Sequence, residues 1–377
     1  VKGEGEVKIY GDITYFDCSY SSSYSSKVTS LDVTNATSLL ELNASSNEIT
    51  TLDLSNNTAL YDLALDNNTL LASLILPSEG QLNSISALSC ALTTLDLTSS
   101  TSLTSLVVND NPGLGSLDLS ANTALTQLKA NNTGLTAIDL SANTALNALY
   151  LNNNQLTTLD VSKMDKGAAT RIYVYAKNNN LTEFITSEQV LLSSTRIYID
   201  GNAFTLATLP AITGINAYNY APQQAMTIAT EITEGEELDL SSQAMVGENA
   251  TVYTWYTADG EEFTSYTVEG GKFVFDVEAD TELYCTMTNA SFDKFSGANA
   301  FKTTNIVVKN LAPAIVLTAT PDVERQFVFE VAKAAKILID WGDGDLVETE
   351  EIGETYPGTE WIGYYKTTVN GTVKGEG

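Results

Sequence analysis

Apolar residues recur along much of this chain with a period of 21 to 22 residues. The segments ITTLDLSNNTALYDLALDNNT and LTAIDLSANTALNALYLNNNQ show the pattern, and such a period is typical of stacked repeats. The apolar residues that open the repeats are Val28, Ile49, Leu71, Leu92, Leu114, Leu135, Leu156 and Leu181. The pattern therefore predicts eight repeats, the last two lengthened by insertions.

Within each repeat the apolar residues occupy positions 1, 4, 6, 12, 15 and 17. They form two short L-x-L tracks with a period of two, which is typical of strands and not of helices. A single repeat cannot bury these side chains, but repeats stacked about 4.8 Å apart can pair their strands and pack leucine on leucine. We therefore predict a β-solenoid in which each track is a short strand.

Position 20 of the repeat is an asparagine in most layers. A buried turn must satisfy its backbone groups, and a carboxamide can both donate and accept along the stack. The exceptions are Cys90 and Thr133, and we interpret Cys90 as a structural replacement for one asparagine. The asparagines are Asn47, Asn68, Asn111, Asn154, Asn179 and Asn202.

The register L-x-x-L-x-L-x-x-N-x-L, intact as LNALYLNNNQL at residues 146–156, resembles the leucine-rich-repeat family. The resemblance covers roughly residues 13–219, and the LDLSxNTxL segment is similar to the short, helix-poor repeats of internalin-like bacterial surface proteins. It implies a secreted or cell-surface adhesion protein. It also implies that the outward residues at positions 14, 16 and 18 form a concave recognition surface.

Two further modules are predicted after the solenoid, which we assign to residues 1–221 with its N-terminal cap. Alternating segments such as TVYTWYT and TELYCTMTN predict a β-sandwich at residues 222–310. Trp255 and Tyr284-Cys285 resemble the immunoglobulin-like core, although a partner cysteine is missing. The expected fold is mainly β: a leucine-rich-repeat solenoid followed by two β-sandwich domains, one immunoglobulin-like and one PKD-like.

The PKD-like assignment covers residues 311–377. The WGDG at residues 341–344, followed by TYPG at 355–358, resembles PKD-type β-sandwich modules. Asp343-Gly344 is interpreted as a tight hairpin turn, and calcium binding by this aspartate-rich loop is left open. The letters VKGEG stand at both ends of the chain, so we expect the full protein to alternate solenoids with sandwich modules.

The composition of the chain disfavours several classes of partner and activity. The chain has 47 acidic and 18 basic residues, a formal charge of −29, which disfavours nucleic acids and anionic membrane surfaces and leaves neutral or cationic partners. Histidine is absent, which removes the commonest general base and metal ligand. No apolar run approaches the length of a membrane span, and three distant cysteines make no disulfide framework. We expect no enzyme activity and no cofactor, and the oligomeric state is left open.

The expected recognition surface is acidic in its early layers and rich in tyrosine in its late ones. Tyrosine and arginine are enriched at binding hot spots, and aromatic faces also suit stacking on sugar rings. The alternative is that cross-strand tyrosines only stabilise the sheet. The candidate ligand-binding residues are Tyr150, Tyr173, Tyr175, Lys177, Arg196 and Tyr198.

Aspartates also recur at position 5, for example Asp118 and Asp139. They allow a cation ladder or catalytic pairs, but we expect each to accept hydrogen bonds within its own turn. The sequence therefore predicts a non-catalytic extracellular binding or adhesion protein that binds a protein or glycan on the concave face. The alternatives are a structural stalk without a specific ligand and, from a third class, a polysaccharide-processing enzyme.

Overall fold

The computed structural model describes residues 5–23, 26–79, 81–165 and 171–310 with their side chains. Beyond residue 310 it describes the backbone of four strands. The chain divides into two compact units, Val1–Leu311 and Ala312–Gly377. The first unit contains both the predicted solenoid and the predicted second module, so the division of residues 1–310 into two domains stays a prediction.

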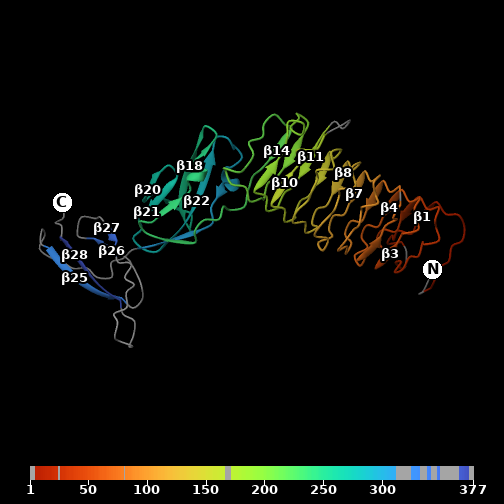
Figure 1. Ribbon diagram of the computed structural model, residues 1–377, viewed down its shortest axis with the longest axis horizontal. Coiled ribbons are helices and arrows are strands. Elements are labelled where there is room, and N and C mark those ends of the chain that lie inside the picture. The colour runs from red at the N-terminus through yellow and green to blue at the C-terminus, as the bar shows by residue number, and fades with distance from the viewer. Residues whose placement is uncertain are drawn as a thin grey trace. The chain divides into compact units, whose positions relative to one another are not determined.

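Residues 15–219 form a helix-poor β-solenoid with a parallel ten-stranded sheet along one side, as predicted (Figure 1). Each strand has three residues, and neighbouring strands pair without offset, so equivalent repeat positions form straight rows. The strands in spatial order are β1 (Tyr15–Asp17), β2 (Glu41–Asn43), β4 (Asp62–Ala64), β6 (Ser84–Ser86), β7 (Ser105–Val107), β8 (Gln127–Lys129), β9 (Ala148–Tyr150), β11 (Tyr173–Tyr175), β13 (Arg196–Tyr198) and β14 (Ala217–Asn219).

The solenoid interior is built from the predicted apolar positions. Leu63, Leu106 and Leu149 stand at the centres of their strands and are almost completely buried. Because side chains alternate along a strand, the residues on either side of each central residue point outward. Each fully buried leucine stabilises the fold by about 1.5–3 kcal/mol, so the stack becomes stable only when many layers contribute.

The position-20 asparagines form the predicted ladder. The Nδ2 of Asn154 donates to the carbonyls of Leu151 in its own layer and Ala130 in the preceding one, at 3.0 and 2.8 Å. Its Oδ1 accepts from the amide of Leu135. Cys90 is buried in the same row with its Sγ 3.4 Å from the Leu65 carbonyl, which confirms its structural assignment.

The prediction that both tracks of every repeat are strands was wrong for four of the eight first tracks, those of the repeats that open at Val28, Leu92, Leu114 and Leu135. Among the described residues, β3 (Thr51–Asp53) pairs with β5 (Ser73–Ile75) and β10 (Thr158–Asp160) with β12 (Glu183–Ile185). Elsewhere on this side a second asparagine row joins the layers. Asn122 donates from Nδ2 to the Leu97 and Ser100 carbonyls of the preceding layer, so side chains bond backbone groups at the end of the first track and after it.

Position 19 adopts the left-handed conformation in successive layers, which the sequence analysis did not predict. The φ of its non-glycine residues lies between 54° and 62°, in Ser46, Asn67, Ser89, Asp110, Asn132, Asn153 and Asn178. Asparagine, aspartate and glycine tolerate this region best. Gly201, with φ of 74°, ends the row, and a Cβ there would lie 2.2 Å from the Asn178 Oδ1.

The solenoid ends at glutamines just beyond the predicted boundary at residue 221. The Gln223 Nε2 donates to the Ile199 carbonyl, and Gln224 donates to the Asn179 carbonyl at 2.7 Å. Tyr220 then contacts the rings of Phe292 and Phe295 in the following region. The last layer is therefore covered by side chains from residues that follow it.

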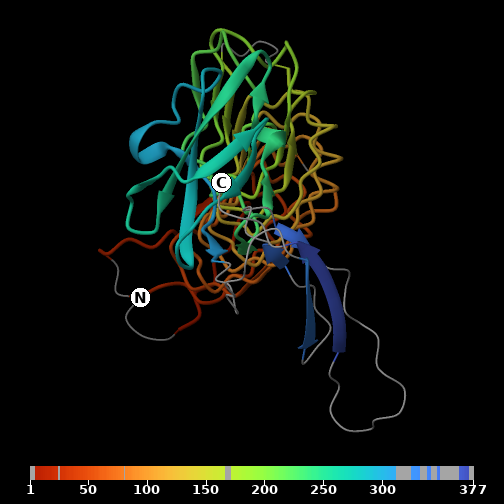
Figure 2. The same ribbon diagram turned by 90° about the vertical axis from the view of Figure 1, so that its left-hand side faces the viewer.

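Residues 231–309 form two β-sheets (Figure 2). In the larger sheet the long strands β18 and β22 pair antiparallel along their lengths. One sheet has the order β15-β24-β22-β18-β17, with β19 and β23 attached, and the other has the order β16-β21-β20. The elements are β15 (Glu231–Thr233), β16 (Glu237–Asp239), the 3-10 helix η1 (Ser241–Gln243), β17 (Met245–Val246), β18 (Asn249–Thr257), β19 (Glu262–Phe263), β20 (Tyr266–Glu269), β21 (Lys272–Phe275), β22 (Thr281–Asn289), the 3-10 helix η2 (Gly297–Asn299), β23 (Phe301–Lys302) and β24 (Ile306–Lys309).

Trp255 lies at the centre of this region. It is fully buried, faces Cys285 across the β18–β22 pair and makes edge contacts with Phe273 and Phe275 of the other sheet at 5.4 and 4.8 Å. These are the residues on which the immunoglobulin-like resemblance rests. The family assignment itself stays a prediction.

In the C-terminal unit the described backbone forms two antiparallel pairs. They are β25 (Glu324–Val331) with β28 (Tyr365–Thr372) and β26 (Leu338–Asp340) with β27 (Leu346–Glu348). The WGDG and TYPG motifs, the aspartate-rich loop after residue 340 and both VKGEG segments lie mainly outside the described residues. The PKD-like and calcium predictions therefore stay predictions.

Candidate binding surface

Five of the six predicted ligand-binding residues lie on three adjacent strands of the ten-stranded sheet, and Lys177 follows one of these strands by two residues. Tyr150, Tyr175 and Tyr198 occupy the same place in β9, β11 and β13 and pair directly with one another across the sheet. Tyr173 and Arg196 pair in the same way two residues earlier. All five side chains are half-buried on the outer face of the sheet, so the register of the repeat places them together.

Tyr150, Tyr175 and Tyr198 form a continuous stack of rings. The ring centroids are 4.9 Å apart between Tyr150 and Tyr175 and 4.6 Å apart between Tyr175 and Tyr198, with interplanar angles of 6° and 5°. These spacings match the separation of paired strands, so the backbone itself sets the stack. Burial between its neighbours raises the pKa of Tyr175, and the nearby Tyr198 and Tyr150 raise it further.

Cationic side chains cover the ends of the stack. The Nζ of Lys129 lies over the Tyr150 ring and that of Lys177 over the Tyr198 ring, each 5.6 Å from the centroid. Such cation–π contacts are worth about 0.5–1 kcal/mol at exposed sites. Tyr175 thus has a ring on each face, and Tyr150 lies between Tyr175 and Lys129, so face-on stacking of a sugar, which the sequence suggested, finds no free face on these two rings.

Tyr173 is covered in the same manner. The Cζ of Arg196 lies 5.8 Å from the centroid of its ring, and the Nη1 of Arg171 donates to its hydroxyl at 3.3 Å. The Nε of Arg196 also donates to the Asn216 Oδ1 at 2.8 Å, which fixes the guanidinium over the sheet. We call Lys129, Arg171, Tyr150, Tyr173, Tyr175, Lys177, Arg196 and Tyr198 together the tyrosine patch.

Lys129 and Arg171 were not among the predicted site residues. Lys129 stands in the same row as Tyr150, so the repeat register already contained the signal for it. Arg171 precedes β11 and has no equivalent in the other repeats, because it follows an insertion. Only the fold brings it to Tyr173.

The outward asparagines at position 18 form hydrogen bonds with the backbone of the next layer. The Oδ1 of Asn109, Asn131 and Asn152 each accepts from the backbone amide at the equivalent position of the next layer, at 2.7 to 2.9 Å. Lys177 at this position forms an ion pair with Asp200 at 3.3 Å. This row therefore stabilises the stack, and the residues at positions 14 and 16 form the exposed surface.

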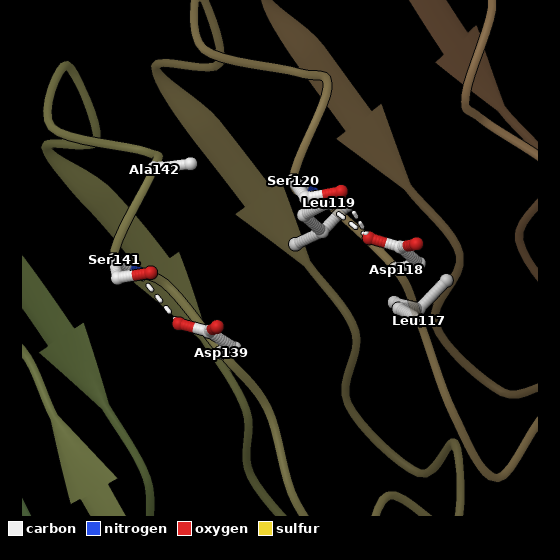
Figure 3. Close-up of a pocket in the computed structure, with 7 residues that line it drawn as sticks. All are labelled: Leu117, Asp118, Leu119, Ser120, Asp139, Ser141 and Ala142. Atoms are coloured by element: carbon white, nitrogen blue, oxygen red, sulfur yellow. Dashed lines mark hydrogen bonds between the residues drawn. The ribbon is translucent and has the colours of Figure 1, made fainter.

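The position-5 aspartates accept hydrogen bonds in their own turns, as expected. In Figure 3 the Asp118 Oδ1 accepts from the hydroxyl and amide of Ser120, at 2.6 and 3.0 Å, and Asp139 accepts from Ser141. The Ser120 hydroxyl is the main cause that lowers the pKa of Asp118. Within the described residues no group of three or more acidic, cysteine or histidine side chains could hold a metal ion.

The cysteines are free thiols in apolar surroundings. Burial raises the pKa of Cys18 and Cys90 to about 11 and that of Cys285 to about 12. A thiol with such a pKa remains protonated at neutral pH and is a poor nucleophile. In the part of the chain that the structure describes, no helix has the length and apolar character needed to span a membrane.

Comparison with known proteins gives no match to a protein-family profile and none to a curated protein sequence. Among solved structures, the chain is similar to the functional domain of InlJ from Listeria monocytogenes, which includes a cysteine ladder. The alignment covers 79% of this chain and 67% of that chain at 21% sequence identity, with a TM-score of 0.36. This likeness is too weak to define a family or a ligand.

Proposed function

We propose that the protein is a non-catalytic, leucine-rich-repeat adhesion protein of the cell surface or extracellular space that binds a ligand through the tyrosine patch. The observation that carries the proposal is the concentration of four tyrosines and four cations on β8, β9, β11, β13 and the residues that flank β11. Tyrosine combines a large contact area with few rotatable bonds and a polar tip, which favours binding hot spots.

The test replaces Tyr150, Tyr175 and Tyr198 together with alanine. The variant and the parent chain are compared for capture of purified extracellular-matrix proteins and glycans by surface plasmon resonance. We expect the variant to lose capture. Cross-strand pairs contribute about 0.2–1 kcal/mol each, so the melting temperature should fall only slightly.

A matched control exists in the region after the solenoid. Tyr256 and Tyr284 also stack, with centroids 5.5 Å apart and an interplanar angle of 21°, and Lys302 lies over Tyr284. Replacing both tyrosines with alanine should leave capture unchanged. If the solenoid variant captures its ligand as well as the parent chain does, the patch is not the binding surface.

The second candidate is a structural stalk without a specific ligand. It is favoured by the fact that the rings cover one another, which is sufficient to stabilise a sheet without any partner. If the protein is such a stalk, the parent chain captures nothing from the panel, and the triple alanine substitution lowers only the stability of the fold.

A further inference from the structure

The outer face of the solenoid sheet changes its charge along the stack. Asp17, Glu41 and Asp62 stand in the outward rows at β1, β2 and β4. From β8 to β14 the same two rows contain no carboxylate. Their residues are Gln127, Lys129, Ala148, Tyr150, Tyr173, Tyr175, Arg196, Tyr198, Ala217 and Asn219.

The cations of the tyrosine patch are largely without acidic partners. Among the described residues, Lys129, Arg171 and Arg196 form no ion pair with a carboxylate, and only Lys177 does so, with Asp200. The chain as a whole has 47 acidic and 18 basic residues. Elsewhere Lys272 and Lys309 each contact two carboxylates, whereas Lys294 and Lys302 lie over tyrosine rings as the patch cations do.

The result is a local positive potential on a strongly acidic protein. The net charge of −29 favours neutral or cationic partners for the chain as a whole. Exposed charges more than about 10 Å away are largely screened at 0.1 M salt, so a partner at the patch responds to the nearby cations.

The chemistry left exposed on the patch is that of hydrogen-bond donors. Tyr175 has a ring on each face, Tyr150 lies between Tyr175 and Lys129, and one cation lies over each of Tyr173 and Tyr198. The groups presented are therefore mainly tyrosine edges and hydroxyls, ammonium groups and guanidinium groups. Carboxylates accept well from all of these donors, and charge-assisted bonds are about twice as strong as neutral ones. Sugar rings bind protein surfaces mainly by lying on aromatic faces, and Tyr150 and Tyr175 offer none that is free.

We propose that the tyrosine patch binds an acidic peptide segment of a protein partner, an inference that rests on the proposed function and specifies its ligand class. Lys129, Arg171 and Arg196 contact the carboxylates of the segment. The tyrosine hydroxyls donate to its carboxylate or backbone oxygens. The carboxylate-free rows from β8 to β14 admit the segment without charge repulsion.

The test measures fluorescence anisotropy with a labelled 12-residue peptide that alternates aspartate and serine. A matched peptide carries asparagine at each aspartate. We expect the acidic peptide to bind at least tenfold more tightly than the neutral one and its affinity to fall as NaCl increases from 50 to 500 mM. Equal affinity for the two peptides overturns the inference.

Charge-removing variants locate the binding surface. Lys129→Gln combined with Arg196→Gln should weaken binding of the acidic peptide at least tenfold. The control is Lys302→Gln, because Lys302 also lies over a tyrosine ring, at 5.5 Å from the Tyr284 centroid, and belongs to β23 in the region after the solenoid. The inference is wrong if the double variant binds as the parent chain does, or if the control weakens binding equally.

Two further measurements distinguish other possible ligands of the tyrosine patch. Binding of polygalacturonate but not of the acidic peptide identifies an anionic glycan and overturns the inference. Sedimentation of the parent chain as a dimer that Lys129→Gln dissociates identifies a second copy, whose acidic rows at Asp17, Glu41 and Asp62 are complementary, and overturns it too. If a neutral ligand is captured through the tyrosines while the acidic peptide is not bound, this inference fails and the proposed function stands.

Discussion

Replacing Asn111 with alanine tests whether the asparagine ladder holds the solenoid together. The Asn111 Nδ2 donates to the carbonyls of Ala87 and Val108, at 2.8 and 2.9 Å, and its Oδ1 accepts from the Leu92 amide at 3.1 Å. Asn111, Ala87, Val108 and Leu92 are all fully buried. The substitution therefore removes one partner from each of three buried backbone groups.

The magnitude follows from the cost of leaving such groups unpaired. Each unsatisfied buried donor or acceptor costs about 1–3 kcal/mol, so three such groups should lower the free energy of unfolding by about 3–9 kcal/mol. Cys90→Ala is the matched control in the same row. The Leu65 carbonyl near its Sγ also accepts from Asn68, so this variant leaves no group unpaired there and should cost about 1 kcal/mol.

The assay is urea unfolding followed by far-ultraviolet circular dichroism. All three tryptophans lie after residue 250, so tryptophan fluorescence follows the rest of the chain as an internal reference. With a slope of about 2–3 kcal/mol/M in urea, Asn111→Ala should lower the midpoint by at least about 1 M. If it lowers the midpoint no more than Cys90→Ala does, the ladder is not a main source of stability.

Two other predictions concern titration. At pH 8 iodoacetamide should label Cys90 and Cys285 only after urea is added. Burial raises the pKa of these thiols to about 11 and about 12 and keeps them protonated in the folded chain. Rapid labelling of the folded chain would contradict this prediction. Ser120→Ala should raise the pKa of Asp118 in a carboxyl-carbon NMR titration while Asp139 is unchanged. Because the folded pKa of Asp118 is below its unfolded value, its stabilising effect is present above the unfolded pKa and is lost as pH falls through the folded pKa.

The sequence predicted the solenoid because its signal is repeated. Each repeat carries the same apolar positions, so a chance substitution in one layer, such as Cys90, does not hide the period. The role of the position-20 asparagines followed from the need to pair buried backbone groups, and the hydrogen bonds of Asn154 and Asn111 confirm it. The binding role of the tyrosines stays a prediction.

The two exceptions in the ladder show what the sequence alone did not explain. Leu71 is the third residue after Asn68, whereas Ile49 is the second residue after Asn47. The extra residue lets the Leu71 amide bond the Asn68 carbonyl at 2.9 Å, so the layer that ends at Cys90 no longer needs an asparagine as acceptor. The Leu114 amide bonds the Asn111 carbonyl in the same way, in the layer of Thr133.

By itself, the sequence determined the repeat, its inward leucines and the row in which the tyrosines stand, because these depend only on a period that is written in the order of residues. The tertiary structure decided which neighbours cover each ring: Lys129 over Tyr150 and Arg171 beside Tyr173. It also decided that four of the eight predicted first tracks are not strands, those of the repeats that open at Val28, Leu92, Leu114 and Leu135. These outcomes depend on distances between separate layers, which only the folded stack brings within contact.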